Sequence, residues 1–289
     1  MTKRILILGG DGLLGKDLQS YFAKIKGFSV SGVGRHQLDI TDENAVERKI
    51  HDMKPNFVIN CAAYTNVDKA EMDKNTCKRI NVDGAGNVAR VVSNFGSELI
   101  HISTASVFTS EDDGYIGQGS YYSPANYYSQ TKVEAEQICR EIFEPQGLLT
   151  IFRTYWLYGF SKPNFTTFVA SNLLQRKQIK IVANQFGQPT STRAVFQAII
   201  HRIESRIPIG IYSATNAGST SRIGWAQAIS ELLNVESGLV ESVDETYFAS
   251  PAQRPFNTSL DHQLWSKHGI EFPDWKIELN DFLRSSYSQ

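Results

Sequence analysis

Short apolar runs alternate with stretches of helical spacing through the first half of the chain. The apolar runs are bounded by glycine, proline or polar turns, which predicts strands over Arg4–Leu8, Phe28–Val33, Phe57–Cys61, Leu99–Ser103 and Leu148–Phe152. Apolar residues three and four apart predict helices over Leu13–Ile25, Asp42–Met53, Thr76–Phe95 and Tyr127–Phe143. Because parallel strands need such crossovers, the pattern predicts an α/β fold with a doubly wound parallel sheet.

After about residue 158 the alternation becomes irregular. We expect a loop over Phe160–Asn164, a helix over Phe165–Gln175 and a short strand over Ile179–Val182. A polar, turn-rich segment over Asn184–Arg193 follows, and then a strand over Ile209–Ala214 and a helix over Ile223–Leu233. This part is predicted to form a smaller C-terminal lobe, with elements of about residues 190–215 returning to the main sheet.

Composition narrows the class of protein. The net charge of -1 gives no electrostatic reason to expect nucleic acid or an anionic membrane as a partner. No apolar run approaches the roughly 20 residues of a membrane span. Three cysteines without CxxC spacing and a first strand that starts at Arg4 favour a cytoplasmic protein without a signal peptide. The six histidines have no metal-binding spacing, so no metal is expected.

A glycine turn, Gly9-Gly10-Asp11-Gly12-Leu13-Leu14-Gly15, joins the first predicted strand to the first predicted helix. Strand, glycine turn and helix in this order can seat a pyrophosphate, because a helix N-terminus supplies amide donors and a favourable dipole. We expect Gly9, Gly12, Leu13, Leu14 and Gly15 to bind a dinucleotide, with a ligand-free turn as the alternative. Residues 1–158 are then a Rossmann-type NAD(P)-binding domain, and residues 159–289 mainly a substrate-binding lobe.

The end of the second predicted strand bears on which dinucleotide binds. Arg35 stands where an acid would bind the ribose 2′-hydroxyl, and an arginine there can meet a 2′-phosphate. This favours NADPH, with NADH still open, although a solvated surface arginine would give the same sequence. By position, Asp39 and Ile40 are expected to border the adenine.

The segment after the third predicted strand is Cys61-Ala62-Ala63-Tyr64. Its small residues would let the chain pass close to a cofactor, so all four are candidate cofactor contacts. The same residues could instead pack tightly in the core, with Tyr64 as a core aromatic.

Candidate catalytic groups come from two later segments. Ser103 and Thr104 end a predicted strand, and a hydroxyl there can orient a carbonyl and stabilise a developing oxyanion; Thr104 is preferred and Ser103 is the alternative. Tyr128 and Lys132 lie four residues apart, hence on one helix face. A nearby ammonium lowers the pKa of a phenol, so Tyr128 is predicted to be a general acid, with Lys132 also reaching the nicotinamide ribose.

Taken together, these motifs resemble those of the extended short-chain dehydrogenase/reductases, and within them the dTDP-4-dehydrorhamnose reductases. The similarity covers nearly the whole chain. Its most specific segments are 59–71, 81–84, 101–104, 126–132, 153–159, 164–165, 184–190 and 254–257.

The resemblance implies an enzyme that uses NAD(P)H to reduce the 4-keto group of a nucleotide-linked 6-deoxysugar, with dTDP-4-dehydrorhamnose as the leading substrate and dTDP-rhamnose as the product. Thr104, Tyr128 and Lys132 would be the catalytic residues. The resemblance places Thr65, Val67 and Trp156, with Thr104, beside the sugar, and Asn164, Gln185 and Arg254 near the diphosphate. Some family members dimerise through acidic metal sites, so a homodimer stays open, with Asp17 as a candidate remnant.

The chain departs from this family after Thr104. The family usually continues with Asp-Tyr-Val-Phe-Asp-Gly, whereas Ala105-Ser106-Val107-Phe108-Thr109-Ser110 follows here. The loss of a carboxylate and a phenol beside the sugar can change substrate choice by orders of magnitude without affecting the reduction machinery. A non-catalytic cofactor-binding regulatory subunit, or an epimerase or reductase of another nucleotide sugar, is therefore the alternative.

Overall fold

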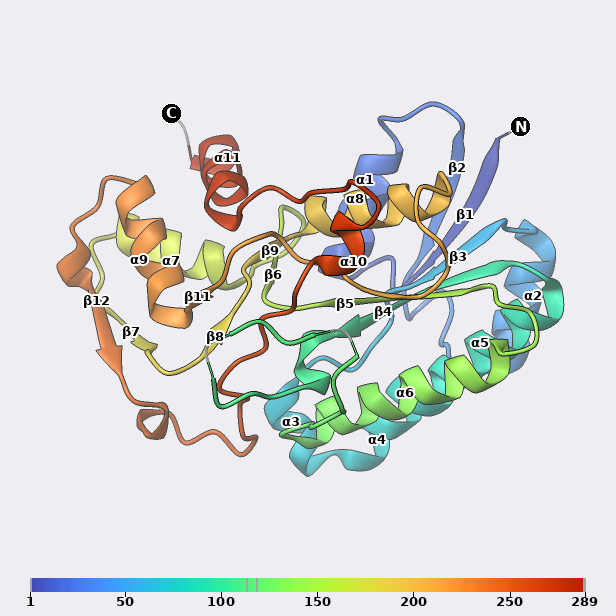
Figure 1. Ribbon diagram of the computed structural model, residues 1–289, viewed down its shortest axis with the longest axis horizontal. Coiled ribbons are helices and arrows are strands. Elements are labelled where there is room, and N and C mark those ends of the chain that lie inside the picture. The colour runs from blue at the N-terminus through green and yellow to red at the C-terminus, as the bar shows by residue number, and fades with distance from the viewer. Residues whose placement is uncertain (1, 113, 118, 288–289) are drawn as a thin grey trace.

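Six parallel strands form the central sheet of the computed structural model (Figure 1). The structure describes residues 2–112, 114–117 and 119–287. The strands lie in the order β10-β5-β4-β3-β1-β2, and their bounds are β1 (Lys3–Leu8), β2 (Phe28–Val33), β3 (Phe57–Asn60), β4 (Glu98–Thr104), β5 (Leu149–Thr154) and β10 (Ile211–Ser213). Every adjacent pair is parallel, which confirms the predicted sheet.

Helices cover both faces of this sheet, because successive strand residues point to opposite sides. Leu6 and Leu8 pack in one core cluster, and Ile5 and Ile7 pack in the other. The first cluster lies under α2 (Glu43–Met53), α5 (Gly84–Phe95) and α6 (Tyr127–Phe143), and the second under α1 (Leu13–Phe22) and α8 (Thr192–Ile203). The helices of each face appear below and above the sheet in Figure 1.

Beside the sheet lies a second core, separate from the two clusters on the faces of the sheet; it is at the left of Figure 1. It contains Leu173, Trp225, Trp275 and Phe282 and joins α7 (Phe165–Leu174), α9 (Arg222–Leu232) and α11 (Trp275–Tyr287). Paired strands complete it: β7 (Ile179–Val182) with β12 (Val240–Val243), β8 (Phe186–Gly187) with β11 (Thr220–Ser221), and β6 (Leu157–Tyr158) with β9 (Thr190–Ser191).

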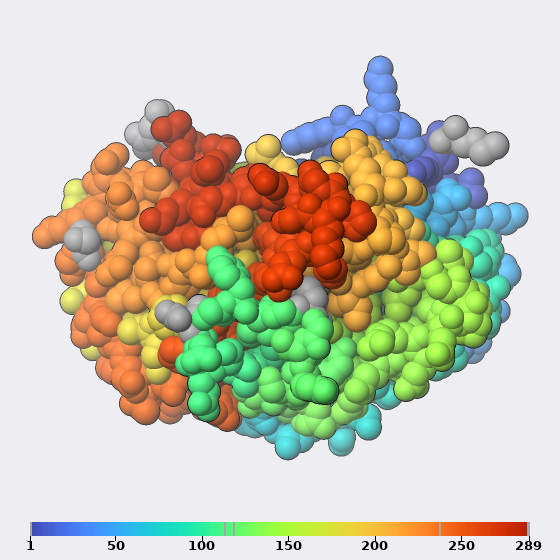
Figure 2. All heavy atoms as spheres, in the orientation of Figure 1, coloured from blue at the N-terminus to red at the C-terminus, as the bar shows by residue number. Residues whose placement is uncertain are grey.

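Short helices complete the chain: α3 (Val67–Met72), α4 (Lys74–Lys78), a π-helix η1 (Arg79–Asp83), α10 (Gln263–Ser266), and 3₁₀ turns η2 (Ala105–Val107), η3 (Ser237–Leu239) and η4 (Glu245–Tyr247). The segment between η2 and α6 lies against the C-terminal segment near residue 257, where the green and red surfaces meet in Figure 2. Asn257 fixes this contact by donating to the carbonyl oxygens of Asp112 and Gly114, at 2.7 and 2.6 Å. Among the described helices, none is both long and apolar enough to cross a membrane.

The local sequence pattern predicted most of the helices and strands. The bounds of β2, β7 and α6 agree with the sequence pattern, and Asp42 caps α2 by accepting from the amide of Ala45. The helix expected over Leu13–Ile25 ends at Phe22, and Cys61 lies just beyond β3. The helix expected over Thr76–Phe95 starts at Lys74 and contains the π-helical turn η1. We did not predict α8 or α11.

Candidate active site

The glycine turn between β1 and α1 forms a cradle, and three of its glycines are required for different structural reasons. Gly9 has φ +75°, and a Cβ on it would lie 2.7 Å from the amide nitrogen of Ala62. On Gly15, a Cβ would lie 2.3 Å from the carbonyl oxygen of Gly9. By contrast, a Cβ on Gly12 meets only the Gly9 oxygen, at 3.2 Å, and would otherwise enter the cavity that Gly12 lines. Gly9 and Gly15 are thus needed for packing, and Gly12 leaves room for a ligand to reach the helix N-terminus.

One cavity of about 700 Å³ opens at the carboxyl ends of the sheet strands. It is lined by every residue that the sequence marked for the cofactor, namely Gly9, Gly12, Leu13, Leu14, Gly15, Arg35, Asp39, Ile40, Cys61, Ala62, Ala63, Tyr64 and Lys132. The same cavity is lined by Thr104, Tyr128, Thr65, Val67 and Trp156. The structure therefore brings the glycine turn and the candidate catalytic groups, 89 to 123 positions apart in sequence, to one place.

Arg35 and Asp39 face each other at the rim of this cavity. The Nε atom of Arg35 lies 3.6 Å from Oδ2 of Asp39, and the arginine side chain is 65% exposed. Burial acts to raise the pKa of Asp39, but hydrogen bonds from the amide and hydroxyl of Thr41 and the charges of Arg35 and Arg79 lower it overall. Arg35 thus keeps most of its guanidinium open to a further anion.

The loop after β3 is held by Asn81, which lies in the π-helical turn η1. Its Oδ1 accepts from the amide of Tyr64 at 2.7 Å, and its Nδ2 donates to the Tyr64 carbonyl at 3.2 Å and to Thr131 Oγ1 at 3.0 Å. Tyr64 lines the cavity, and burial together with the nearby Asp73 raises the pKa of its hydroxyl. The glycine cradle, where a Cβ on Gly12 would enter the cavity, fits a bound dinucleotide.

Hydrogen bonding decides between the two hydroxyls at the end of β4. Ser103 donates to Oε1 of the buried Glu136 at 2.5 Å, so its hydroxyl is engaged in the core. The Thr104 oxygen lies 2.9 Å from Ser106 Oγ and accepts from the Ser106 amide at 3.2 Å. Because Ser129 donates to Ser106 at 2.9 Å, Ser106 can in turn donate to Thr104. With both lone pairs of Thr104 accepting from Ser106, its O–H is left to donate on the cavity side, where Tyr128 is its hydrogen-bond partner.

Lys132 and Tyr128 both line the cavity, but no hydrogen bond joins them within the described chain. The Lys132 ammonium donates to the Ile102 carbonyl at 2.9 Å and lies 3.3 Å from His101 Nε2. Burial raises the pKa of Tyr128, opposed by its hydrogen bond with Thr104. This is opposite to the lowering that we expected from Lys132. The helical spacing puts the two on one face, but the lysine side chain extends to the backbone of β4.

The residues expected near the diphosphate do not all meet. Gln185 and Arg254 line a second, larger cavity of about 1070 Å³. Asn164 lines neither of these two cavities: it caps α7, accepting from the amide of Thr167 at 3.3 Å and donating to the Gly159 carbonyl at 2.8 Å. Because these bonds use its amide within the fold, we leave Asn164 out of the proposed ligand set.

Asp17 is also engaged in the fold. Its buried carboxylate accepts from the amide of Phe160 at 3.0 Å and the hydroxyl of Thr192 at 2.6 Å, and also from the hydroxyl of Ser161. Among the described residues, no group of three or more potential metal ligands occurs. Within the described chain, the Asp17 carboxylate therefore serves to hold α1 against the residues that precede α7 and begin α8.

The first two residues that depart from the family pattern are buried. Ala105 and Ser106 are 0% and 3% exposed, and they line neither cavity. Ala105 packs in a small apolar cluster against which Tyr155 is placed, and Tyr155 itself lines the smaller cavity. The sequence interpretation missed Tyr155, although it directly precedes Trp156, and it missed Arg222, for which no local signal existed.

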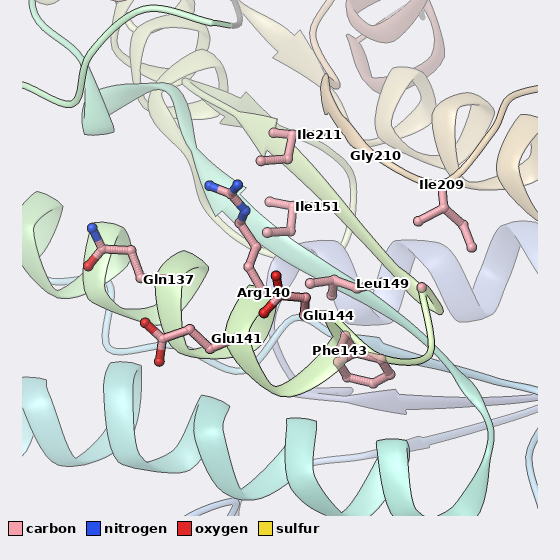
Figure 3. A pocket seen from close by; sticks show the side chains of 11 residues that line it. Gln137, Arg140, Glu141, Phe143, Glu144, Leu149, Ile151, Ile209, Gly210 and Ile211 are labelled. Carbon is pink, nitrogen blue, oxygen red and sulfur yellow. The ribbon is translucent and has the colours of Figure 1, made fainter.

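A further hollow of about 500 Å³ lies away from these groups, between α6 and strands β5 and β10. Figure 3 shows its lining, which includes Arg140, Glu141, Ile209 and Ile211. It contains no predicted site residue from the described chain, so we assign it no role.

Comparisons with known proteins agree with this geometry. The family model described as the RmlD substrate binding domain matches residues 3–288. A dTDP-4-dehydrorhamnose reductase from Mycolicibacterium smegmatis is 34% identical over 97% of this chain and 85% of its own length. A dTDP-4-keto-6-deoxy-D-glucose reductase from Streptomyces niveus is 32% identical over 93% of this chain and 92% of its own.

A solved structure is similar along the same length. The crystal structure of dTDP-4-dehydrorhamnose reductase from Bacillus anthracis, in complex with NADP, superposes with a TM-score of 0.92 at 30% identity, covering 99% of this chain and 100% of that one. The resemblance inferred from the motifs is therefore confirmed. The chain belongs to the RmlD substrate binding domain family and has dTDP-4-dehydrorhamnose reductases among its relatives.

Proposed function

We propose that this protein uses NADPH to reduce the 4-keto group of a dTDP-linked 6-deoxysugar, converting dTDP-4-dehydrorhamnose to dTDP-rhamnose. The observation that carries the proposal is the single cavity lined by the glycine turn, Thr104, Tyr128 and Lys132. Relatives that act on dTDP-linked keto sugars, similar over nearly the full chain, support the choice of substrate. In this arrangement residues 1–158, with elements of about 190–215, serve the cofactor, and most of 159–289 serves the substrate.

The protein's own groups supply orientation, a proton and a positive charge. The bound nicotinamide supplies the hydride that adds to the carbonyl carbon. Thr104 donates its O–H to the carbonyl oxygen and orients it, because its lone pairs already accept from Ser106. Tyr128 transfers its phenolic proton to the same oxygen as the C–O π bond breaks, which leaves an alcohol on the sugar and a phenolate on the enzyme. The raised pKa of Tyr128 keeps the phenol protonated at neutral pH, as a proton donor needs.

The positive charge of Lys132, which lines the same cavity, favours this proton transfer. Its contacts with the Ile102 carbonyl and the His101 ring fix the position of the ammonium group. Burial lowers its pKa to about 8, so the group is a cation at neutral pH. A nearby cation stabilises the phenolate that forms as Tyr128 gives up its proton.

Turnover is the direct test of this function. NADPH oxidation would be followed by the loss of absorbance of the reduced nicotinamide, with a panel of dTDP-, UDP- and GDP-linked 4-keto sugars. The products would be identified by mass spectrometry and NMR. We expect turnover with dTDP-4-dehydrorhamnose and stoichiometric formation of dTDP-rhamnose. Bound NADPH without turnover on any member of the panel would contradict an enzymatic function.

Gly12→Ala is predicted to weaken NADPH binding about tenfold or more, because the methyl group separates the phosphates from the amides of α1. Gly12 has extended backbone, φ -71° and ψ 170°, which alanine adopts without strain, so thermal stability should stay near that of the wild type. Isothermal titration with NADPH measures the effect. Gly119→Ala, where an added Cβ meets nothing within 4 Å, is the control. Unchanged affinity in Gly12→Ala would exclude this binding position.

Reduction is predicted to slow as the pH rises through about 8, where Lys132 loses its proton. The sign follows from the lowered pKa: the charged form predominates below 8 and the neutral form above it. With one ionisation, kcat should halve near pH 8 and fall about tenfold by pH 9. Burial raises the pKa of the neighbouring Cys61 thiol to about 12, outside this range. Stopped-flow rates at saturating NADPH, with binding checked at each pH, test this, and a flat profile to pH 10 would contradict it.

A further inference from the structure

Arg222 lies among three aromatic rings at the start of α9. Its guanidinium carbon is 4.0 Å from the ring centroid of Phe165, 4.8 Å from that of Trp156 and 5.5 Å from that of Trp225. The two tryptophan rings stack on each other with centroids 5.6 Å apart. Cation–π contact of this kind holds a positive charge in place but uses the ring faces and not a hydrogen-bond acceptor.

The charge of Arg222 has no counter-ion in the described part of the chain, where its guanidinium makes neither an ion pair nor a hydrogen bond. Other buried or partly buried arginines are compensated. Arg153 pairs with Glu136 at 2.6 Å, Arg202 with Glu98 at 2.7 Å, and Arg254 with Asp68 at 2.8 Å. The fold thus supplies acidic partners elsewhere and supplies none here.

The backbone around Arg222 is firmly placed. Ser221, its predecessor, caps α9 by accepting from the amide of Gly224 at 3.0 Å. The Arg222 amide donates to the Gln185 carbonyl at 2.8 Å, next to the antiparallel pairing of Ser221 with Phe186. The position of the guanidinium is therefore set by the backbone as well as by the rings.

Burial lowers the pKa of Arg222 to about 10, and the nearby Arg254 adds to this effect, while Tyr155 opposes it. The side chain is still a cation at neutral pH. Arg222 is half-buried on the wall of the larger cavity, so an anion bound there gains a cation that the described residues leave without a counter-ion. An arginine presents five N–H donors in a planar fork that matches phosphate geometry.

Arg222 stands where the two cavities meet. It lines the larger cavity with Gln185 and Arg254. Trp156, against which its guanidinium lies, lines the smaller cavity with Tyr128. A ligand that spans both cavities, with its reacting end at Tyr128, therefore passes close to Arg222.

We propose that Arg222, together with Arg254, binds the diphosphate of the nucleotide-sugar substrate, which supplies the counter-ion that the fold lacks. The identity of this ligand rests on the proposed function; the role of Arg222 is additional to it. Arg254 lines the same cavity and is paired with Asp68, so Arg222 supplies the uncompensated charge and Arg254 supplies further N–H donors for the second phosphate.

The test uses the full-length protein and dTDP, dTMP and thymidine as probes, with affinities from isothermal titration and thermal shifts. In Arg222→Gln we expect dTDP affinity to fall about tenfold or more and the preference for dTDP over dTMP to shrink by a similar factor. Thymidine binding should change little. Arg222→Lys should recover only part of the affinity, because it lacks the planar fork. Arg48→Gln, an exposed arginine on α2, removes the same charge as a matched control.

Kinetics separate this inference from the proposed function. With dTDP-4-dehydrorhamnose, Arg222→Gln should raise KM about tenfold or more and leave kcat within a few-fold. If the variant loses dTDP binding but the wild type reduces no keto sugar, the function is wrong and the role of Arg222 stands. Normal turnover with unchanged dTDP affinity in Arg222→Gln overturns the inference and leaves the function intact. A wild type that does not bind dTDP overturns the inference as well.

Discussion

Replacing Tyr128 by phenylalanine should lower kcat for reduction of the 4-keto sugar by a factor of about 10² to 10⁴, with NADPH affinity unchanged. Phenylalanine keeps the ring that lines the cavity and removes only the hydroxyl next to Thr104. The hydride would still be available, but the oxygen of the ketone would have to take its proton from water. Stopped-flow measurement of NADPH oxidation at saturating sugar isolates this step from substrate binding.

A matched control is available one position earlier on the same helix. Tyr127 also lies on α6, where its ring contacts the ammonium of Lys74 at 5.1 Å, and it does not line the cavity. Tyr127→Phe should therefore have kcat close to that of the wild type. Near-normal turnover in Tyr128→Phe would show that another group donates the proton.

Glu136→Gln should lower the free energy of unfolding by about 3–5 kcal/mol. Glu136 is 0% exposed and accepts from Arg153 at 2.6 and 3.0 Å, from Tyr122 at 2.8 Å and from Ser103 at 2.5 Å. The amide of glutamine removes the negative charge that Glu136 places beside the Arg153 guanidinium. It also turns an NH₂ group toward neighbouring groups that are themselves donors. Urea denaturation followed by circular dichroism measures the loss.

An exposed pair provides the comparison. Arg90 lies 2.9 Å from Glu43, with side chains 43% and 46% exposed, and Glu43→Gln should cost no more than about 1 kcal/mol because water screens the pair. If Glu136→Gln and Glu43→Gln lowered the free energy of unfolding equally, burial would not be what makes the Glu136 pair important. The pair Glu136–Arg153 also joins α6 to β5, so its loss should reduce activity by loosening the helix that carries Tyr128 and Lys132.

Many elements of the fold could be predicted because their signals are local. The helix α6 starts where Asn126 accepts from the amide of Ser129, and its apolar spacing continues to Phe143. The strand β2 is an apolar run between turns. The helices α8 and α11 were missed, since their stability comes from burial against α1 and against the second core, and this burial depends on contacts far along the chain.

The candidate site was predictable to the extent that spacing sets it. The glycine turn and the residues along the carboxyl ends of the strands line one cavity, because parallel strands end on the same edge of a sheet. Asn164 was placed near a ligand by resemblance, whereas its amide caps α7. Arg222 could not be found this way, because its three aromatic neighbours come from separate segments of the chain.

The sequence by itself determined the parallel α/β architecture, the position of the glycine turn and the face shared by Tyr128 and Lys132. Only the tertiary structure decided that Ser103 binds Glu136 while Thr104 lies beside Tyr128 at the cavity, that Lys132 contacts His101 and Ile102, and that burial raises the pKa of Tyr128. The physical reason is that backbone periodicity sets the direction of a side chain along its own element. Its partners, its exposure and therefore its charge depend on what packs against that element.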